Sequence, residues 1–302
     1  MAIGGSDLQG FPVPKVSLEK QKKIKDILRT VDAAIEKTEA LIEKYTRIKD
    51  GMMQDLFTRG LTEDGKLRPS RADAPELYQE TPIGWIPKDW EVQVVADLAL
   101  PQKGSTVIGP FGSDLVVSDY RSEGVPIIFV RDVKENYFNW VSDVFLSQAK
   151  AFKLYAHRVT SGDLLVTKMG VPPGITCVYP EDQPLAIVTA DMIRMSPDKG
   201  KVDPEWLGLA VNQDRSKRQV AMITAGVTRP KITLADFRGL KIAVPPLREQ
   251  QDTASRIKHL QKMLEQERAK LDKLKLQKTG LMHDLLTGKV PININVPELE
   301  NV

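Results

Sequence analysis

Two long segments without proline, one near each end of the chain, restrict the fold more than any other feature of the sequence. One runs from Gln21 to Thr58 and the other from Gln250 to Thr287, and a shift of 229 residues aligns them without a gap. Ten of the 38 aligned residues are identical, most visibly in GMMQDLFTRG (51–60) and GLMHDLLTGK (280–289). Two unrelated helices would share a period but not these residues, so we infer duplicated helices.

Both segments carry an apolar seam whose spacing alternates between three and four residues, which is the pattern of a coiled coil. The first seam contains Ile24, Leu28, Val31, Ile35, Ile42, Tyr45, Ile48, Met52 and Leu56, and the second contains Ile257, Leu260, Leu264, Leu271, Leu274, Leu281 and Leu285. Helices of about 40 residues would be about 60 Å long, and a seam of that length needs an apolar partner.

The order of the segments predicts how the two helices pair. The first ends where the central part of the chain begins, and the second begins where that part ends, so we expect them to run antiparallel, with residue i opposite about residue 308 − i. This register would bring Thr38 and Glu267, the polar residues at seam positions, close together near the middle of the coil. Such a polar layer would oppose sliding of one helix along the other.

The central part has the pattern of a mixed α/β domain. Short β-rich runs such as VPIIFVRDV, DLLVTKM and LKIAVP alternate with turn sequences, and a helix is expected at 204–219. The predicted fold class is α+β: one mixed α/β domain flanked by two long helices that form an antiparallel coiled coil. The stretch at 61–80, rich in Gly, Pro and charge, is predicted to be a linker or a partly ordered crossing.

Composition excludes several classes of protein. The single cysteine, Cys177, excludes an intrachain disulfide and is expected in the core, and three scattered histidines with one cysteine exclude a zinc cage. No apolar run approaches the roughly 20 residues of a membrane span, so a cytoplasmic protein without membrane contact is expected. Asp163 and Asp191 flank strands and are expected to cap turns, and PDKGK (197–201) lacks the acidic strand of a nuclease site. We predict no catalytic residue, metal or cofactor.

Charge is distributed unevenly, although the net charge is only +3. Residues 206–241 hold two acidic residues against seven basic ones, namely Arg215, Lys217, Arg218, Arg229, Lys231, Arg238 and Lys241. A local basic strip on a nearly neutral domain suits a partner such as DNA that is recognised by its sequence and not only bound through its charge. A solvated face is the competing interpretation.

The chain resembles the specificity (S) subunit of type I restriction–modification enzymes. The resemblance covers nearly the whole chain from about residue 12 and is carried by several phrases in order, namely EKTEALIEKYTRIKDGMMQDLFTRG, TPIGWIPKDWEV, GPFGSDLVVSDYRSEGVPIIFVRDV, GDLLVTKMG and GVTRPKITLADFRGLKIAVPPLREQ. It implies a lead-in (1–16), a first spacer helix (17–60), a linker (61–80), a target recognition domain (81–247), a second spacer helix (248–290) and a tail (291–302). The family's subunit usually has two recognition domains, whereas one is found here.

The resemblance also implies function and partners. The chain would be a non-catalytic subunit that recognises double-stranded DNA and directs modification (methyltransferase) and restriction subunits to a bipartite site, and a homodimer would restore two recognition domains. The alternatives are a stand-alone DNA-binding protein, a coiled-coil adapter without restriction partners, or a self-sufficient DNA methyltransferase or nuclease.

DNA recognition needs phosphate contacts for position and base contacts for sequence. The predicted phosphate contacts are Arg215, Lys217, Arg218 and Lys231. The predicted base contacts are loop residues able to form several hydrogen bonds: Arg131, Asn136, Lys168 and Arg229, followed by Lys103, Ser105 and Thr106. Tyr137, Phe138 and Trp140 could reach into a groove, although packing in the core is an equal expectation for the last two.

Overall fold

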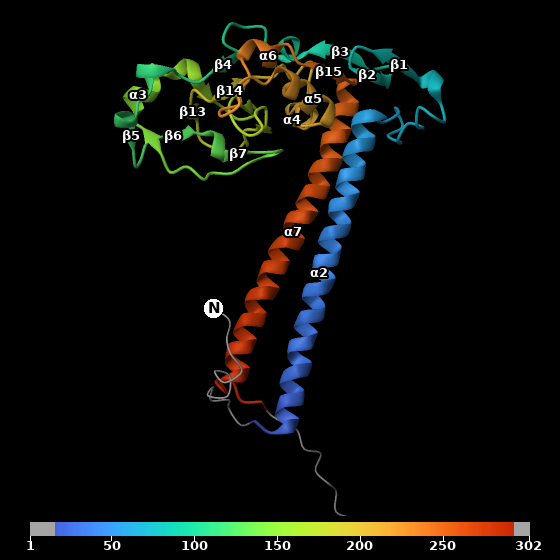
Figure 1. Cartoon of the computed structure of the whole chain (residues 1–302), viewed down its shortest axis with the longest axis vertical. Helices are drawn as coiled ribbons and strands as arrows, with labels where there is room; N and C mark the ends of the chain where they lie inside the picture. Colours follow the sequence, from blue (N-terminus) through green and yellow to red (C-terminus); the bar gives the residue numbers. More distant parts are fainter. Residues whose placement is uncertain (1–15, 293–302) are drawn as a thin grey trace, which may run out of the picture. The chain divides into compact units, whose positions relative to one another are not determined.

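The computed structural model describes residues 16–292, which form two compact units (Figure 1). One unit contains the described residues up to Gly51 and from His259 onward, and the other contains Met52–Lys258. The predicted lead-in and tail lie outside the described residues, except for Val16, Pro291 and Ile292. No helix within 16–292 is both long enough and apolar enough to cross a membrane.

The first unit is an antiparallel pair formed by most of α2 (Leu18–Thr58) and most of α7 (Leu247–Leu286). Lys278 pairs with Asp32 (2.7 Å) and Lys275 with Glu39 (2.9 Å), so the residue number falls along α2 as it rises along α7. Every predicted seam residue except Ile48 is at least half-buried. The antiparallel coiled coil predicted from the sequence is confirmed.

The paired residue numbers add to 310 for Asp32 and Lys278 and to 314 for Glu39 and Lys275, a few residues from the predicted 308, and no contact between Thr38 and Glu267 is found within residues 16–292. Glu39, which follows Thr38, is held by Lys275, and Glu267 lies eight residues earlier, roughly 12 Å along α7. Each polar group is satisfied within its own helix: the Thr38 hydroxyl donates to the Ala34 carbonyl (2.8 Å), and Glu267 pairs with Lys270 (3.4 Å).

The second unit contains all the strands and the short helices (Figure 1). The main sheets are a five-stranded sheet of order β10-β13-β6-β9-β5, in which β13 and β6 are parallel, and an antiparallel four-stranded sheet of order β12-β11-β14-β4. Three two-stranded pairs are β1–β2, β15–β3 and β7–β8. The strands are β1 (Tyr78–Thr81), β2 (Gly84–Pro87), β3 (Glu91–Val94), β4 (Thr106–Ile108), β5 (Tyr120–Arg121), β6 (Val125–Ile128), β7 (Val133–Lys134), β8 (Tyr137–Phe138), β9 (Phe145–Leu146), β10 (Arg158–Val159), β11 (Leu164–Thr167), β12 (Thr176–Val178), β13 (Ala186–Val188), β14 (Met192–Met195) and β15 (Lys241–Val244).

The expected helix at 204–219 is two helices, α4 (Pro204–Val211) and α5 (Asp214–Ile223). The break falls at Asn212, whose buried side-chain amide accepts from Thr176 N (3.1 Å) and donates to Thr176 O (2.7 Å). Two further helices and six short 3₁₀ helices complete the unit: α3 (Gln148–Lys153), α6 (Leu234–Arg238), Pro75–Leu77, Val95–Leu98, Gly112–Asp114, Val117–Asp119, Val130–Asp132 and Tyr155–His157.

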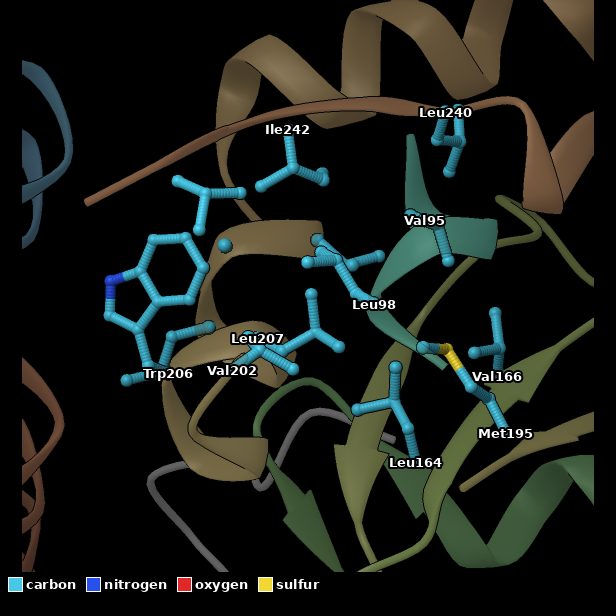
Figure 2. Packing of buried hydrophobic residues seen from close by; sticks show 14 of the residues in the cluster. Val95, Leu98, Leu164, Val166, Met195, Val202, Trp206, Leu207, Leu240 and Ile242 are labelled. Atoms are coloured by element: carbon cyan, nitrogen blue, oxygen red, sulfur yellow. The ribbon is translucent and has the colours of Figure 1, made fainter. Parts of the chain in front are cut away.

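The largest core cluster joins α4 to the four-stranded sheet and to the ends of both long helices. Figure 2 shows Trp206 and Leu207 of α4 beside Leu98, with Leu164 and Met195 of the sheet across from them. Leu56 and Phe57 of α2 and Ile257 of α7 belong to the same cluster. The last turns of α2 and the first turns of α7 are therefore rooted in the core of the second unit.

The segment after α2, predicted as a linker, is packed rather than free. Buried Arg68 pairs with buried Glu249 (2.7 Å), which also accepts hydrogen bonds from Leu61 N (2.6 Å) and Trp90 Nε1 (3.2 Å). Asp89 is a second partner of Arg68. We call Arg68, Asp89, Trp90 and Glu249 the Glu249 cluster. Burial alone would lower the pKa of Arg68, but Glu249 and Asp89 more than compensate and raise it above its ordinary value.

The glycine that closes the first repeated phrase is explained by this cluster. Gly60 has a φ of +65°, and a Cβ there would lie 2.1 Å from Glu249 Oε1 and 2.4 Å from the Trp90 ring. Only glycine combines this backbone conformation with such a close approach. The aligned residue of the second phrase, Lys289, is exposed and pairs with Asp284 of α7 (3.6 Å).

Candidate nucleic-acid interface

Helix α5 carries three of the predicted DNA-contacting residues, Arg215, Lys217 and Arg218. Its inner face contributes Val220 and Ser216, whose hydroxyl donates to the Ala210 carbonyl (2.8 Å). Val220 packs closely on Gly174: a Cβ added at Gly174 would lie 2.9 Å from the Val220 side chain. Gln219 exchanges hydrogen bonds with the backbone of Lys241 in β15. These contacts fix α5, so its basic residues are carried on a rigid element.

The three basic residues of α5 have different surroundings. Arg215 is half-buried and donates to the Trp85 carbonyl of β2 (2.9 Å), and burial together with the charge of Arg218 lowers its pKa. Lys217 pairs with Glu135 (2.8 Å) in the turn between β7 and β8. Arg218 is exposed. Arg218 therefore has the most accessible charge of the three, whereas Arg215 is held toward the domain.

Two loops lie next to α5 and carry further predicted residues. We call residues 168–174, between β11 and β12, loop A, and residues 224–231, after α5, loop B. Lys168 begins loop A; its Nζ donates to the Ala190 carbonyl (3.0 Å) and lies 4.9 Å from the centre of the Phe111 ring. Burial lowers the pKa of Lys168. Arg229 and Lys231, both in loop B, are exposed.

Arg131 and Lys103 are also exposed, as a contact with a base requires. The Arg131 guanidinium lies 4.5 Å from the centre of the Phe129 ring and lines a pocket of about 500 Å³ together with Thr189 and Asp191. Asp191 also receives hydrogen bonds from the backbone N–H groups of Lys168 and Met169 through its carbonyl, so Arg131 and loop A approach the same turn.

Three of the predicted base contacts, Ser105, Thr106 and Asn136, are engaged within the domain. Ser105 and Thr106 are each only 8% exposed, because Thr106 begins β4 and pairs with Met195 of β14, so the expectation of an open loop there is wrong. Asn136 adopts a φ of 67° in the β7–β8 turn, which asparagine tolerates, and its side-chain oxygen accepts from Asn212 (2.7 Å). That oxygen is therefore already an acceptor for Asn212 within the domain.

Several neighbouring residues were not singled out from the sequence. Trp85 is 40% exposed, and the Arg71 guanidinium lies 4.7 Å from the centre of its ring. Phe111 is 55% exposed beside Lys168. Exposed aromatic residues beside cations are a common feature of nucleic-acid interfaces. In the sequence, these two aromatic residues are marked by the GPFG turn and the GWIP hairpin. Phe138 and Trp140 pack edge-to-face against Tyr179 and against each other, whereas Tyr137 is exposed.

The residues considered for chemistry hold the fold together. Asp163 accepts from Thr160 N (2.8 Å), and Asp198, in the PDKGK segment, accepts from Gly200 N (3.0 Å), so both cap turns. His157 contacts the Ile108 carbonyl through Nδ1 (2.7 Å). Cys177 is buried, as predicted, and burial raises its pKa far above the ordinary value. Within residues 16–292, no group of His, Cys, Asp and Glu side chains could hold a metal ion.

Residues 87–276, more than half of the chain, match the family model described as Type I restriction modification DNA specificity domain. The type I restriction enzyme MjaVIII specificity subunit of Methanocaldococcus jannaschii is 26% identical over 95% of this chain, and the putative MjaX specificity subunit of that organism is 27% identical over 96%. The chain spans 64% and 62% of their lengths. The type I restriction-modification S subunit of M. genitalium has a similar fold, with a TM-score of 0.56, 15% identity, and 94% and 65% of the two chains covered.

Proposed function

Because the chain belongs to the type I restriction modification DNA specificity domain family, we propose that it selects the DNA sequence for a type I restriction–modification system. The observation that carries the proposal is the gathering of basic side chains around α5 and loops A and B of one domain. The chain would direct modification and restriction subunits to the site and contribute no chemistry of its own. Its work would be in the cytoplasm, on double-stranded DNA.

The domain would divide its contacts between backbone and bases. Arg218 and Lys231 are exposed cations suited to phosphates. Arg131, in the 3₁₀ helix Val130–Asp132, and Lys168 and Arg229, in loops A and B, would contact base edges. Arg215 and Lys217 would contribute less directly, since each already has a partner in the domain. We propose that the recognition domain spans residues 81–247 and is extended by the packed segment that follows α2.

We further propose that a second copy of the chain supplies a second recognition domain. The support is a repeated contact: Gln250 Nε2 donates to the Pro245 carbonyl (2.9 Å), and the aligned Gln21 Nε2 donates to the Val16 carbonyl (2.7 Å). Gln250 also accepts from Asp203 N of the recognition domain (2.8 Å). Among the described residues, Gln21 has no equivalent partner.

The two aligned helices also differ in whether an apolar residue near the repeated phrase is covered. Phe57 stacks on Trp206 of the recognition domain (5.9 Å between ring centres), whereas the aligned Leu286 is 48% exposed. Leu286 lines a groove of about 680 Å³ with Ile24 and Leu28. Two recognition domains on a two-fold axis would read inverted half-sites.

Mapping of modified bases across the genome tests the function and the number of recognition domains. Cells with the gene are expected to carry a methylated motif that disappears when the gene is deleted and returns on complementation. A motif with two inverted half-sites would support the second copy, and an asymmetric motif would contradict it. An unchanged set of modified motifs would exclude the proposed function in favour of a stand-alone binding protein or adapter.

Phosphate and base contacts predict different effects of mutation. Arg218→Gln is expected to weaken binding to all DNA alike and to reduce the slope of log K against log salt by about one unit, because one phosphate contact is lost. Arg229→Ala is expected to relax discrimination at one base pair by about 1–3 kcal/mol. Fluorescence anisotropy of the assembled complex at several salt concentrations measures both effects.

Arg121→Gln is the matched control, because Arg121 is exposed but donates to the Ser118 and Tyr120 carbonyls at the edge strand β5. Its salt slope should equal that of the wild type. Equal slopes for all the variants would mean that the basic strip is only a solvated face.

A further inference from the structure

Loops A and B each present a valine to solvent. Val171 in loop A is 88% exposed, and Val227 in loop B is 98% exposed. Fully exposed valines at two loop tips have no role in packing the domain. Isolated apolar side chains are common on protein surfaces, so their exposure needs further observations before it indicates a contact.

The two loops are held side by side by backbone hydrogen bonds. Gly170 N donates to the Pro230 carbonyl (3.2 Å), and Met169 and Lys231 form a β-bridge. Loop B is closed by a reciprocal pair of hydrogen bonds between Ala225 and Lys231 (3.0 and 2.9 Å). The valine tips therefore project from a backbone-paired platform, and ordering them on a partner costs little conformational entropy.

Glycine is required to shape loop B. Gly226 has a φ of +90°, and a Cβ there would lie 3.0 Å from the Arg229 carbonyl oxygen. This turn places Val227 at the tip and Arg229 two residues later on the same loop.

Charge around the tips favours a polyanionic partner. Loops A and B contain Lys168, Arg229 and Lys231 but no aspartate or glutamate. Arg218 of the adjacent α5 adds a fourth cation, and Asp191 lies near Lys168. The centre of a protein–protein interface is usually built from large aromatic side chains and depleted in charge, which differs from two short valines among cations.

We propose that Val171 and Val227 contact thymine methyl groups in the major groove and thereby contribute to sequence choice. The inference rests on the proposed function. The C5-methyl of thymine is the apolar group on the major-groove edges of the bases, and a short apolar side chain can contact it. Wedges that unstack base pairs from the minor groove are typically Phe, Leu, Ile, Met or Pro, so valine fits the methyl contact better.

The test compares thymine with deoxyuridine, which lacks only this methyl group. The probe is a duplex that carries the motif identified by modification mapping, with each thymine replaced in turn, bound to the chain assembled with its modification subunit. At one or two positions, the wild type is expected to bind the deoxyuridine duplex about three- to tenfold more weakly, as expected for the loss of a methyl contact. Val227→Ala and Val171→Ala should each bind the two duplexes equally at one of these positions.

Val117→Ala is the matched control, since Val117 is 77% exposed but lies in the 3₁₀ helix that contains Asp119. The Val117→Ala variant should distinguish the thymine duplex from the deoxyuridine duplex as the wild type does. Thermal melts confirm that the single variants and the Val171→Ala, Val227→Ala double variant fold. The inference would be overturned if the double variant still distinguished thymine from deoxyuridine as the wild type does. It would also be overturned if a valine variant no longer bound the modification subunit but still distinguished thymine from deoxyuridine.

Failure of the inference and of the proposed function give different results. A wild-type assembly that prefers its motif but ignores every thymine methyl overturns the inference alone. A wild-type assembly that binds all DNA sequences equally overturns the proposed function as well.

Discussion

A Glu249→Ala variant is expected to lose about 3–5 kcal/mol of its free energy of unfolding, because the substitution leaves a buried charge without its partner. Arg68 is 6% exposed and would retain Asp89, whose side chain is half-exposed, as its charged partner, beside a hydrogen bond to the neutral Arg59 carbonyl (3.1 Å). Leu61 N and Trp90 Nε1 would lose their acceptor as well. Glu249→Gln keeps the size and one acceptor, so it should lose less. Urea unfolding followed by circular dichroism gives these free energies from the midpoint and slope.

The control for Glu249 is an ion pair of similar length on the surface. Lys217 and Glu135 also lie 2.8 Å apart, but their side chains are 45% and 48% exposed. Glu135→Ala should therefore cost about 0–1 kcal/mol, as expected for a solvated pair. Equal costs for Glu135→Ala and Glu249→Ala would contradict a structural role for the Glu249 cluster.

The long helices could be predicted from the sequence because their signal is local and repeated. The apolar seam continues over about eight to nine turns in each helix, and the duplication gives the same pattern twice. The register could not be predicted as well, because it depends on which side chains reach across the pair. Lys275 spans to Glu39 and Lys278 to Asp32, which moves Thr38 away from Glu267.

The break between α4 and α5 shows where local reasoning fails. The sequence from 204 to 219 contains no proline after Pro204, and that proline stands where a helix begins. The break is held by Asn212, whose amide bonds the backbone of Thr176, a residue 36 positions away in the chain. A propensity argument contains no information about such a partner.

The candidate interface was predictable in its charges but not in its geometry. The basic strip was visible in the sequence, since composition alone reveals it. The partners of Arg215 and Lys217 are 130 and 82 residues away, so only the fold shows that these two cations are already engaged. Ser105 and Thr106 were misplaced for the same reason, because pairing with β14 draws them into the domain. The valines of loops A and B could not be predicted as contacts, because a single apolar residue forms no pattern in the sequence.

Trp206→Ala is expected to cost about 3–5 kcal/mol, the largest effect of any core truncation that the structure suggests. Trp206 is completely buried, stacks on Phe57 with an interplanar angle of 23°, and lies in the cluster that roots α2 and α7. Removing the ring would leave a large cavity where three helices meet. The unfolding free energy in urea measures the loss.

The phenylalanine variant separates packing from hydrogen bonding at the same position. Trp206 Nε1 is buried and makes no hydrogen bond with the described residues, so Trp206→Phe removes an unsatisfied donor while keeping an aromatic ring. It should cost only about 1–2 kcal/mol, and Trp85→Ala, which truncates a partly exposed tryptophan, should cost less than about 1 kcal/mol. If Trp206→Phe were as damaging as Trp206→Ala, the indole would contribute more than packing. If Trp206→Ala cost no more than Trp85→Ala, this core cluster would not be a main source of the stability of the domain.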